Sequence, residues 1–350
     1  MMRTSSKFLI LFIGVLSLSC RSVGPNTLPA DQFNFNTSIS QASNEQLLMN
    51  LVRLRYNEPP VFLKVNSVIN QYTRAGSVGA QAGLNNAIPT GANSAIASGN
   101  LAWSNTPTIT YVPISGKEFS TNLLLPIPPG TLINMIQAGW PIDLVFSLAI
   151  FSINDLKDDV ARPSARREAD AEFLHVVDLW EKLSGAGVLG VRRGEVDLVF
   201  IREDYPIAHK KDVAAFRDLL GLDPGLSEYK IAYGKVQRSD SEFTVLSGSI
   251  WEIMLNLAWQ FDVPQEHVAK GRTVEGFYTD KRVEFPAINI QFSDKEPEDA
   301  FISVLQQGYW FYIHSDDRLS KRNFSFLQLL LNLAESNPSN QMPVVTVPTN

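Results

Sequence analysis

The sequence predicts an α+β or α/β protein in which helices pack on mixed sheets, in two similar-sized lobes with a long β-hairpin of small residues near the N-terminus. Three observations predict this class. Apolar residues recur at helical spacing in several segments, β-branched and aromatic residues alternate in others, and both kinds of segment are interspersed along the chain. The 350 residues are 45% hydrophobic and 19% charged, which excludes a disordered or collagen-like chain.

Residues 1–19 have the layout of a secretory signal peptide. Arg3 and Lys7 form a basic region, and the apolar stretch 8–16 that follows is too short to span a bilayer, which needs about 20 residues. The only cysteine of the chain, Cys20, comes directly afterwards in Leu-Ser-Leu-Ser-Cys. This sequence resembles the lipobox of bacterial lipoproteins, so we predict that Cys20 carries the lipid.

The residues after Cys20 predict where the anchored protein lies. Arg21 stands where many lipoproteins of the inner membrane have Asp, which favours the outer membrane and a body that faces the periplasm. Residues 20–42 lack apolar periodicity and contain Pro25 and Pro29. We therefore expect this segment to be a tether between the lipid and the folded body.

Beyond the tether we predict two domains, an N-terminal α+β domain over residues 43–222 and a C-terminal α/β domain over residues 223–350. The turn Asp223-Pro224-Gly225 marks the boundary. Helical spacing predicts helices at 43–55, 120–125, 129–137, 142–153, 169–183, 212–220, 249–261, 298–307 and 323–335, with a buried strand left open as the alternative for 142–153. Alternation predicts strands at 61–72, 188–192, 196–202, 229–236, 243–246, 287–292, 309–314 and 344–347.

Residues 75–113 form the predicted hairpin, and the chain carries no charge between Arg74 and Lys117. Small residues dominate it, and apolar residues alternate with polar ones in both halves. The apolar series are Val78, Ala80, Ala82 and Leu84 in the first half, and Ala97, Leu101, Trp103, Ile109 and Tyr111 in the second. Low-complexity composition favours a flexible surface hairpin or a disordered insert. The alternative is a hairpin that joins those of other subunits in the outer membrane, where strands avoid charge on the lipid face.

The sequence contains no recognisable catalytic, metal or cofactor motif. Residues 185–190 match GxGxxG, but a helix precedes them and a hairpin follows, the reverse of a dinucleotide site, so we expect no nucleotide. The four histidines lack zinc-site spacing, and a net charge of −6 gives no reason to expect nucleic acid. One polar cluster, His314 with Asp316 and Asp317, is a candidate catalytic or metal site on adjacency alone.

Four segments together resemble a group of uncharacterised bacterial outer-membrane lipoproteins, over most of residues 44–347. They are 45–56 (EQLLMNLVRLRY), 114–119 (ISGKEF), 138–141 (AGWP) and 310–326 (WFYIHSDDRLSKRNFSF). The resemblance implies an envelope lipoprotein, and it implies no activity, cofactor or catalytic residue.

Three functional hypotheses follow. The leading one is a non-catalytic envelope scaffold or interaction module, held at the membrane by its N-terminal lipid, that binds an envelope protein or another copy of itself. The first alternative is a periplasmic hydrolase with an unrecognised site. The second is an oligomeric outer-membrane export component that uses the hairpin 75–113.

Overall fold

The protein, seen in a computed structural model, combines helices with mixed sheets, so the predicted α+β class is confirmed. The chain divides into two compact units, residues 1–43 with 63–113 and residues 44–62 with 114–350; the second is called the body below. Cys20, the signal peptide and the strand predicted at 344–347 lie outside the described residues. The structure describes residues 28–83, 94–158, 160–162, 165–167, 169–276 and 287–335.

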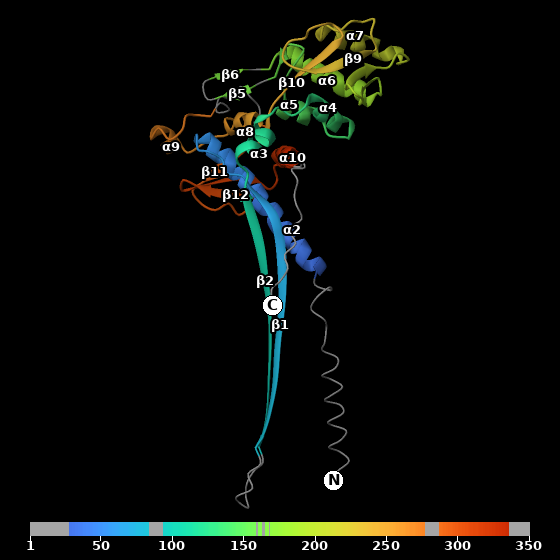
Figure 1. Ribbon diagram of the computed structural model, residues 1–350. Coiled ribbons are helices and arrows are strands. Elements are labelled where there is room, and N and C mark those ends of the chain that lie inside the picture. Colours follow the sequence, from blue (N-terminus) through green and yellow to red (C-terminus); the bar gives the residue numbers. More distant parts are fainter. Residues whose placement is uncertain are drawn as a thin grey trace, which may run out of the picture. The chain divides into compact units, whose positions relative to one another are not determined.

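A six-stranded mixed sheet forms one part of the body (Figure 1). Its order is β4-β3-β10-β9-β8-β7, and every neighbouring pair is antiparallel except β9 with β10. The predicted boundary between residues 222 and 223 falls inside this sheet, since β8 and β9 pair across it. The strands are β3 (Ile150–Ile153), β4 (Leu156–Lys157), β7 (Leu189–Arg192), β8 (Leu198–Ile201), β9 (Glu228–Tyr233) and β10 (Glu242–Ser247).

Aromatic packing joins this sheet to its helices. Trp180 is 1% exposed, and its ring lies 5.2 Å from that of Phe243 on β10 and 5.6 Å from that of Phe146. Burial of rings of this size is the main favourable term in such a core. The helices concerned are α4 (Pro129–Gln137), α5 (Ile142–Ala149), α6 (Ala171–Gly185) and α7 (Lys210–Leu219), with the single turn η2 (Ile207–His209) before α7.

The second sheet of the body has three antiparallel strands in the order β11-β13-β12. They are β11 (Gln291–Ser293), β12 (Ala300–Gln306) and β13 (Tyr309–His314), and β13, the predicted strand 309–314, is the central one. The helix predicted at 298–307 is wrong, because this segment is β12. Its buried residues Ile302 and Val304 alternate with outward ones, and a two-residue turn at Gln307 and Gly308, both with positive φ, leads into β13.

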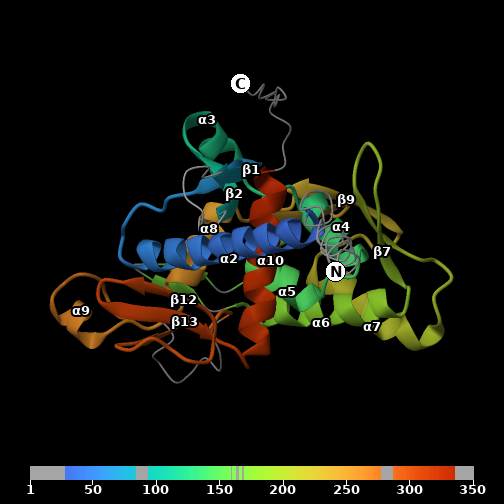
Figure 2. The ribbon, with the colours of Figure 1, turned by 90° about the horizontal axis from the view of Figure 1, so that it is seen from below.

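The remaining helices connect these parts of the body. Figure 2 shows α10 (Arg318–Glu335) between the three-stranded sheet and α5, α6 and α7. Phe326 of α10 packs on Trp140 with ring centroids 5.1 Å apart, and Arg322 pairs with Asp143 at 2.9 Å. A capping box opens α8 (Ile250–Ala258), with Ser249 and Glu252 in both of its hydrogen bonds. The other elements are α3 (Gly116–Phe119), η1 (Ser120–Leu124) and α9 (Gln265–Ala269).

Several helix predictions differ from the structure at their ends; α10, for example, begins at Arg318 rather than at residue 323, and α8 ends at Ala258 rather than at residue 261. The apolar run 142–153 is helix over α5 and strand over β3. The exposed Asp143 and Ser147 give its first part a helical period, whereas residues 148–153 are all buried and have no polar face to set one. The helix expected at 43–55 is α2 (Leu28–Arg55), which begins inside the predicted tether. Pro29 stands in its first turn, where proline costs no hydrogen bond.

The other unit contains a long antiparallel ribbon of β1 (Leu63–Gly83) and β2 (Ser94–Pro113) (Figure 1). It includes the predicted hairpin and extends it through the strand predicted at 61–72. Pairing runs from Leu63 opposite Pro113 to Gly83 opposite Ser94, with one irregularity between Val65 and Ser67. At about 3.3 Å per residue the ribbon is roughly 65 Å long. A further two-stranded ribbon, β5 (Val160–Arg162) with β6 (Ala165–Arg167), belongs to the body.

Candidate functional site

The structure brings together two of the three residues of the predicted polar cluster. His314 Nδ1 and Asp316 Oδ1 are hydrogen-bonded at the end of β13, with side chains 38% and 83% exposed. Asp317 instead faces α10, where its Oδ1 accepts from the Ser320 amide at 2.9 Å and its Oδ2 from the Ser320 hydroxyl at 2.7 Å. That is the geometry of a helix N-cap, so Asp317 has a structural role and the remaining pair lies on the surface.

The glycine motif at 185–190 lies in the predicted context of helix, turn and strand. Helix α6 ends at Gly185, Gly187 has φ of +68°, and β7 begins at Leu189. Gly187 therefore occupies the left-handed position that commonly ends a helix. Among the residues that the structure describes, no three His, Cys, Asp or Glu side chains gather closely enough to hold a metal ion.

A buried polar cluster that the sequence did not indicate surrounds the C-terminal end of α2. Arg55 is 0% exposed, and its guanidinium donates to the Phe261 carbonyl at 3.2 Å, the Thr273 hydroxyl at 2.6 Å and the Val274 carbonyl at 2.7 Å. The same guanidinium lies 4.7 Å from the centre of the Trp259 ring. From the sequence Arg55 reads as an exposed basic residue at a helix end, where it complements the helix dipole.

Burial shifts the pKa values of this cluster. It lowers the pKa of Arg55 to about 10 and raises that of the nearby Asp262. The Tyr56 hydroxyl lies 2.7 Å from Nδ1 of the buried His267; burial raises the pKa of Tyr56 to about 12 and lowers that of His267. These groups tie α2 to α9 and to residues 273–274, and each bond is internal to the body, which makes the cluster a fold-stabilising contact.

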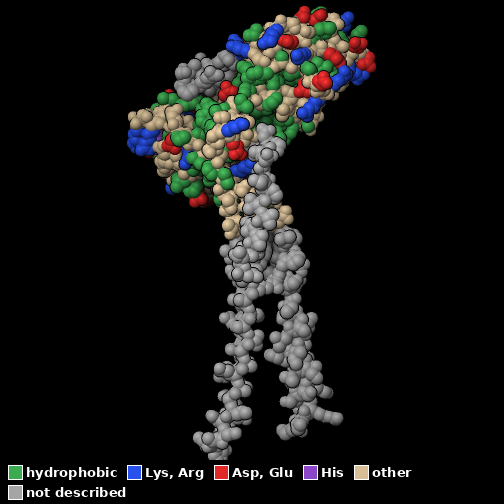
Figure 3. All heavy atoms as spheres, viewed as in Figure 1, with side chains coloured by type: hydrophobic (Ala, Val, Ile, Leu, Met, Phe, Trp, Pro, Cys, Tyr) green, Lys and Arg blue, Asp and Glu red, His purple; other side chains and the backbone are tan. Residues whose placement is uncertain are grey.

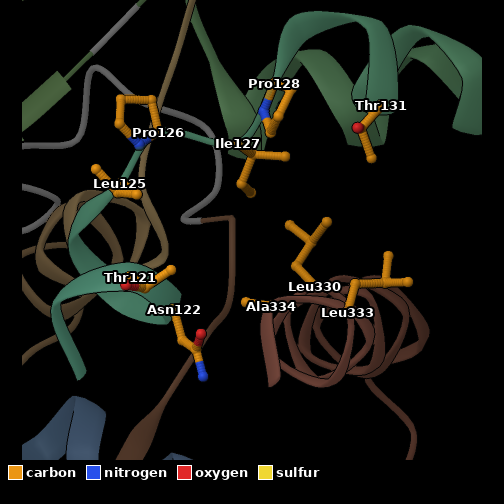
Figure 4. A pocket seen from close by; sticks show the side chains of 10 residues that line it. All are labelled: Thr121, Asn122, Leu125, Pro126, Ile127, Pro128, Thr131, Leu330, Leu333 and Ala334. Carbon is orange, nitrogen blue, oxygen red and sulfur yellow. The ribbon is translucent and has the colours of Figure 1, made fainter. Parts of the chain in front are cut away.

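The described part of the body contains at least two cavities. One, of about 310 Å³, is lined by residues 260–262 and 289–292 and includes Asp262. The other, of about 320 Å³, is shown in Figure 4 and is mainly apolar. Its apolar lining is Leu125, Pro126, Ile127, Pro128, Leu330 and Leu333, and its polar lining is Thr121, Asn122 and Thr131. Neither lining contains His314 or Asp316.

In the hairpin of β1 and β2, most apolar residues lie on one face of the ribbon and most polar residues on the other. In the paired stretch that runs from Arg74 on β1 to Ser94 on β2, even-numbered residues of one strand pair with odd-numbered residues of the other. The two residues of each pair lie on the same face of the ribbon. The apolar face contains Gly76, Val78, Ala80 and Ala82 opposite Leu101, Gly99, Ala97 and Ala95. The other face contains Ser77, Gly79, Gln81 and Gly83 opposite Asn100, Ser98, Ile96 and Ser94. The two apolar series seen in the sequence therefore share one face.

Exposed apolar side chains also occur at the base of the ribbon, where Leu63, Val68 and Tyr111 share the apolar face and Val112, opposite Lys64, lies on the other. Leu63, Val68, Tyr111 and Val112 are 37% to 49% exposed, unlike core residues of the body. On the face of the body drawn in Figure 3, by contrast, acidic and basic side chains are interspersed around α6 and α7, and hydrophobic ones gather over α4, α5 and α10. The hairpin, rather than a catalytic centre, is thus the candidate functional site.

No helix within the described residues has the length and apolar character needed to cross a bilayer. Comparisons of the chain with protein-family models, with curated proteins and with solved structures find no match.

Proposed function

We propose that this chain is a lipid-tethered, non-catalytic component of the bacterial outer membrane that assembles with other copies of itself through the hairpin β1–β2. The observation that carries the proposal is the register of the hairpin beyond Arg74. It collects apolar residues and glycine on one face, and the other face contains hydroxyl and amide residues with glycines and Ile96. The proposal keeps the membrane anchor and self-association of the leading hypothesis. It takes the mode of assembly from the hypothesis of an export component.

The stability of the ribbon supports assembly. Within the described residues β1 and β2 pair only with each other, so each strand has an open edge along its length. A two-stranded ribbon is at best marginally stable in water, and open edges pair readily with further strands. An equivalent hairpin from another copy supplies such a strand with the same pattern of faces. The exposed Val68 and Tyr111 at the base supply apolar area to the same contact.

The charge pattern supports a membrane location for the far half of the hairpin. Beyond Arg74 the paired residues 75–83 and 94–102 are uncharged, nine on each strand. A strand that crosses a bilayer needs about 9–11 residues. Trp103 pairs with Arg74 at the point where charge ends. Aromatic and basic residues of this kind are enriched at the level of the lipid headgroups.

The hydrolase hypothesis gains no comparable support. A hydrolytic site needs its acid, base and substrate within a sheltered cleft. His314 and Asp316 are exposed, and the third residue of that cluster caps a helix.

The size of the protein in mild detergent tests the proposal. We expect the full chain to sediment as a particle of several copies. In the matched variant, Asn-Gly replaces residues 69–108 and joins Val68 to Ile109, which face each other, so that a short hairpin remains. We expect this variant to be a monomer with the thermal transition of the body retained. A monomeric full chain, or a variant of unchanged assembly size, contradicts the proposal.

A further inference from the structure

The apolar cavity of Figure 4 lies where helix α10 ends. Leu330 and Leu333 belong to the last turns of α10 and point across the cavity toward Ile127, which lies before α4. Leu125 on the opposite wall is 58% exposed and Leu333 is 45% exposed. No charged residue lines the cavity. Its volume of about 320 Å³ is at the low end of the range for pockets that hold small ligands, roughly 300 Å³ upward.

The sequence that follows α10 matches the chemistry of the cavity. Residues 336–350 carry no charge, and they contain the apolar stretch Met-Pro-Val-Val-Thr-Val-Pro at 342–348. Proline at both ends of this stretch narrows the backbone conformations open to it, which lowers the entropic cost of binding in an extended form. The hydroxyl and amide groups of Thr121, Asn122 and Thr131 beside the apolar wall are able to pair with the backbone of an extended segment.

The length of chain between them permits the contact. Six residues, 336–341, separate the end of α10 from Met342, and a linker of this length spans up to about 20 Å. The cavity starts on the last turn of α10 itself, so the linker is long enough. A short linker also gives an effective concentration in the millimolar range, so a segment with an intrinsic Kd of about 1 mM fills the cavity in about half of the molecules.

We propose that residues 342–347 of the same chain occupy the cavity between η1, the segment before α4 and α10. The segment covers the exposed apolar wall that Leu125 and Leu333 form. The last residues of the chain thereby hold α10 against the segment that leads into α4.

Disulfide trapping in the full chain tests this contact. Cys20 is the only natural cysteine, so Leu125→Cys with Val345→Cys adds one defined pair. The control is Leu174→Cys with Val345→Cys, because Leu174 is 54% exposed, comparable to Leu125, and lies on α6 away from the cavity lining. Each single substitution alone reports any disulfide formed with Cys20. Under mild oxidation we expect at least a tenfold larger fraction of intramolecular disulfide for the cavity pair than for the control.

A second pair, Thr121→Cys with Val345→Cys, keeps the test decisive if Leu125→Cys disturbs folding, since Thr121 also lines the cavity and is exposed. Equal trapping of the cavity and control pairs overturns the proposal, because it indicates random encounter. Absence of trapping with both cavity pairs also overturns it. A disulfide between two copies overturns it as well, in favour of a cavity filled by another molecule.

Discussion

Val65 of β1 pairs with Tyr111 of β2, and three residues later Val68 pairs with Ile109. In an unbroken strand Val65 and Val68 would lie on opposite faces, because side chains alternate. The irregularity at Asn66 adds one residue to β1 and returns both valines to one face. The odd-numbered positions of β2 from Tyr111 to Ala95 stay on this face, and Asn105 is the polar residue among them. The bulge thus puts the apolar residues at the base of the ribbon on the same face as those beyond Trp103, with Asn70, Arg74 and Asn105 between the two groups.

Replacing the buried arginine of the body should destabilise the fold. Arg55→Ala leaves the carbonyls of Phe261 and Val274 without their donor and opens a cavity beside Trp259. We expect a loss of roughly 3 kcal/mol or more in the free energy of unfolding, measured by chemical denaturation. The matched control is Arg202→Ala, which removes an exposed ion pair with Asp204 and should change the unfolding midpoint little. Equal effects of the two substitutions would contradict the role given to Arg55.

The buried histidine should make stability depend on pH. The Tyr56 hydroxyl is hydrogen-bonded to Nδ1 of the buried His267, and burial lowers the pKa of His267 in the folded state. Arg272 and Lys270 lower this pKa further, and Glu266 opposes them. Below pH about 6.5, the ordinary histidine pKa, His267 is protonated in the unfolded state and still neutral in the folded state. Stability therefore falls as the pH decreases from about 6.5 toward the lowered folded-state pKa of His267.

The variant His267→Gln measures this contribution, because glutamine fills the site and does not titrate. The free energy of unfolding of the natural chain should fall faster between pH 7 and pH 5 than that of His267→Gln. Parallel pH profiles for the two proteins would show that His267 is not the group responsible.

The aspartates after β13 should differ in their effect on stability. Asp317→Ala removes the cap of α10, which we expect to cost about 1 kcal/mol in unfolding free energy. Asp316→Ala removes an exposed partner of His314 and should leave the thermal transition almost unchanged. The two residues are adjacent and chemically identical, so each is the control of the other. A larger loss of stability with Asp316→Ala than with Asp317→Ala would contradict the structural role given to Asp317 and would support a functional role for the polar cluster.

Lipid attachment is a prediction from the sequence. Cells grown with labelled palmitate should incorporate label into the natural chain, and Cys20→Ala should carry none. Label retained by Cys20→Ala would place the lipid elsewhere and remove the basis for the proposed outer-membrane address.

Most helices and strands of the body were predictable, because apolar spacing and local signals agreed there. The capping box at Ser249 and Glu252 and the aromatic strand 309–314 are examples. The segment 298–307 was predicted as a helix because Glu298 and Asp299 resemble a helix start. It forms a strand because it pairs with β13. The Arg55 cluster had no local signal, since its partners Phe261, Thr273 and Val274 are more than 200 residues away. Of the hairpin, the alternation was visible in the sequence, but the register that unites the two apolar series was not.

Two neighbouring lysine substitutions test the central claim most directly. Val78 lies on the apolar face of the hairpin and Ser77 on the polar face. A lysine on a lipid-facing position near the middle of a bilayer costs about 2–4 kcal/mol, and each copy in an assembly bears this cost. The test uses the full chain with either Val78→Lys or Ser77→Lys. For each variant we would measure the size of the particle in mild detergent and its resistance to carbonate extraction from membranes. We expect Val78→Lys to abolish the multi-copy particle and Ser77→Lys to preserve it. Equal behaviour of the two variants, or loss of assembly with Ser77→Lys alone, would contradict the account.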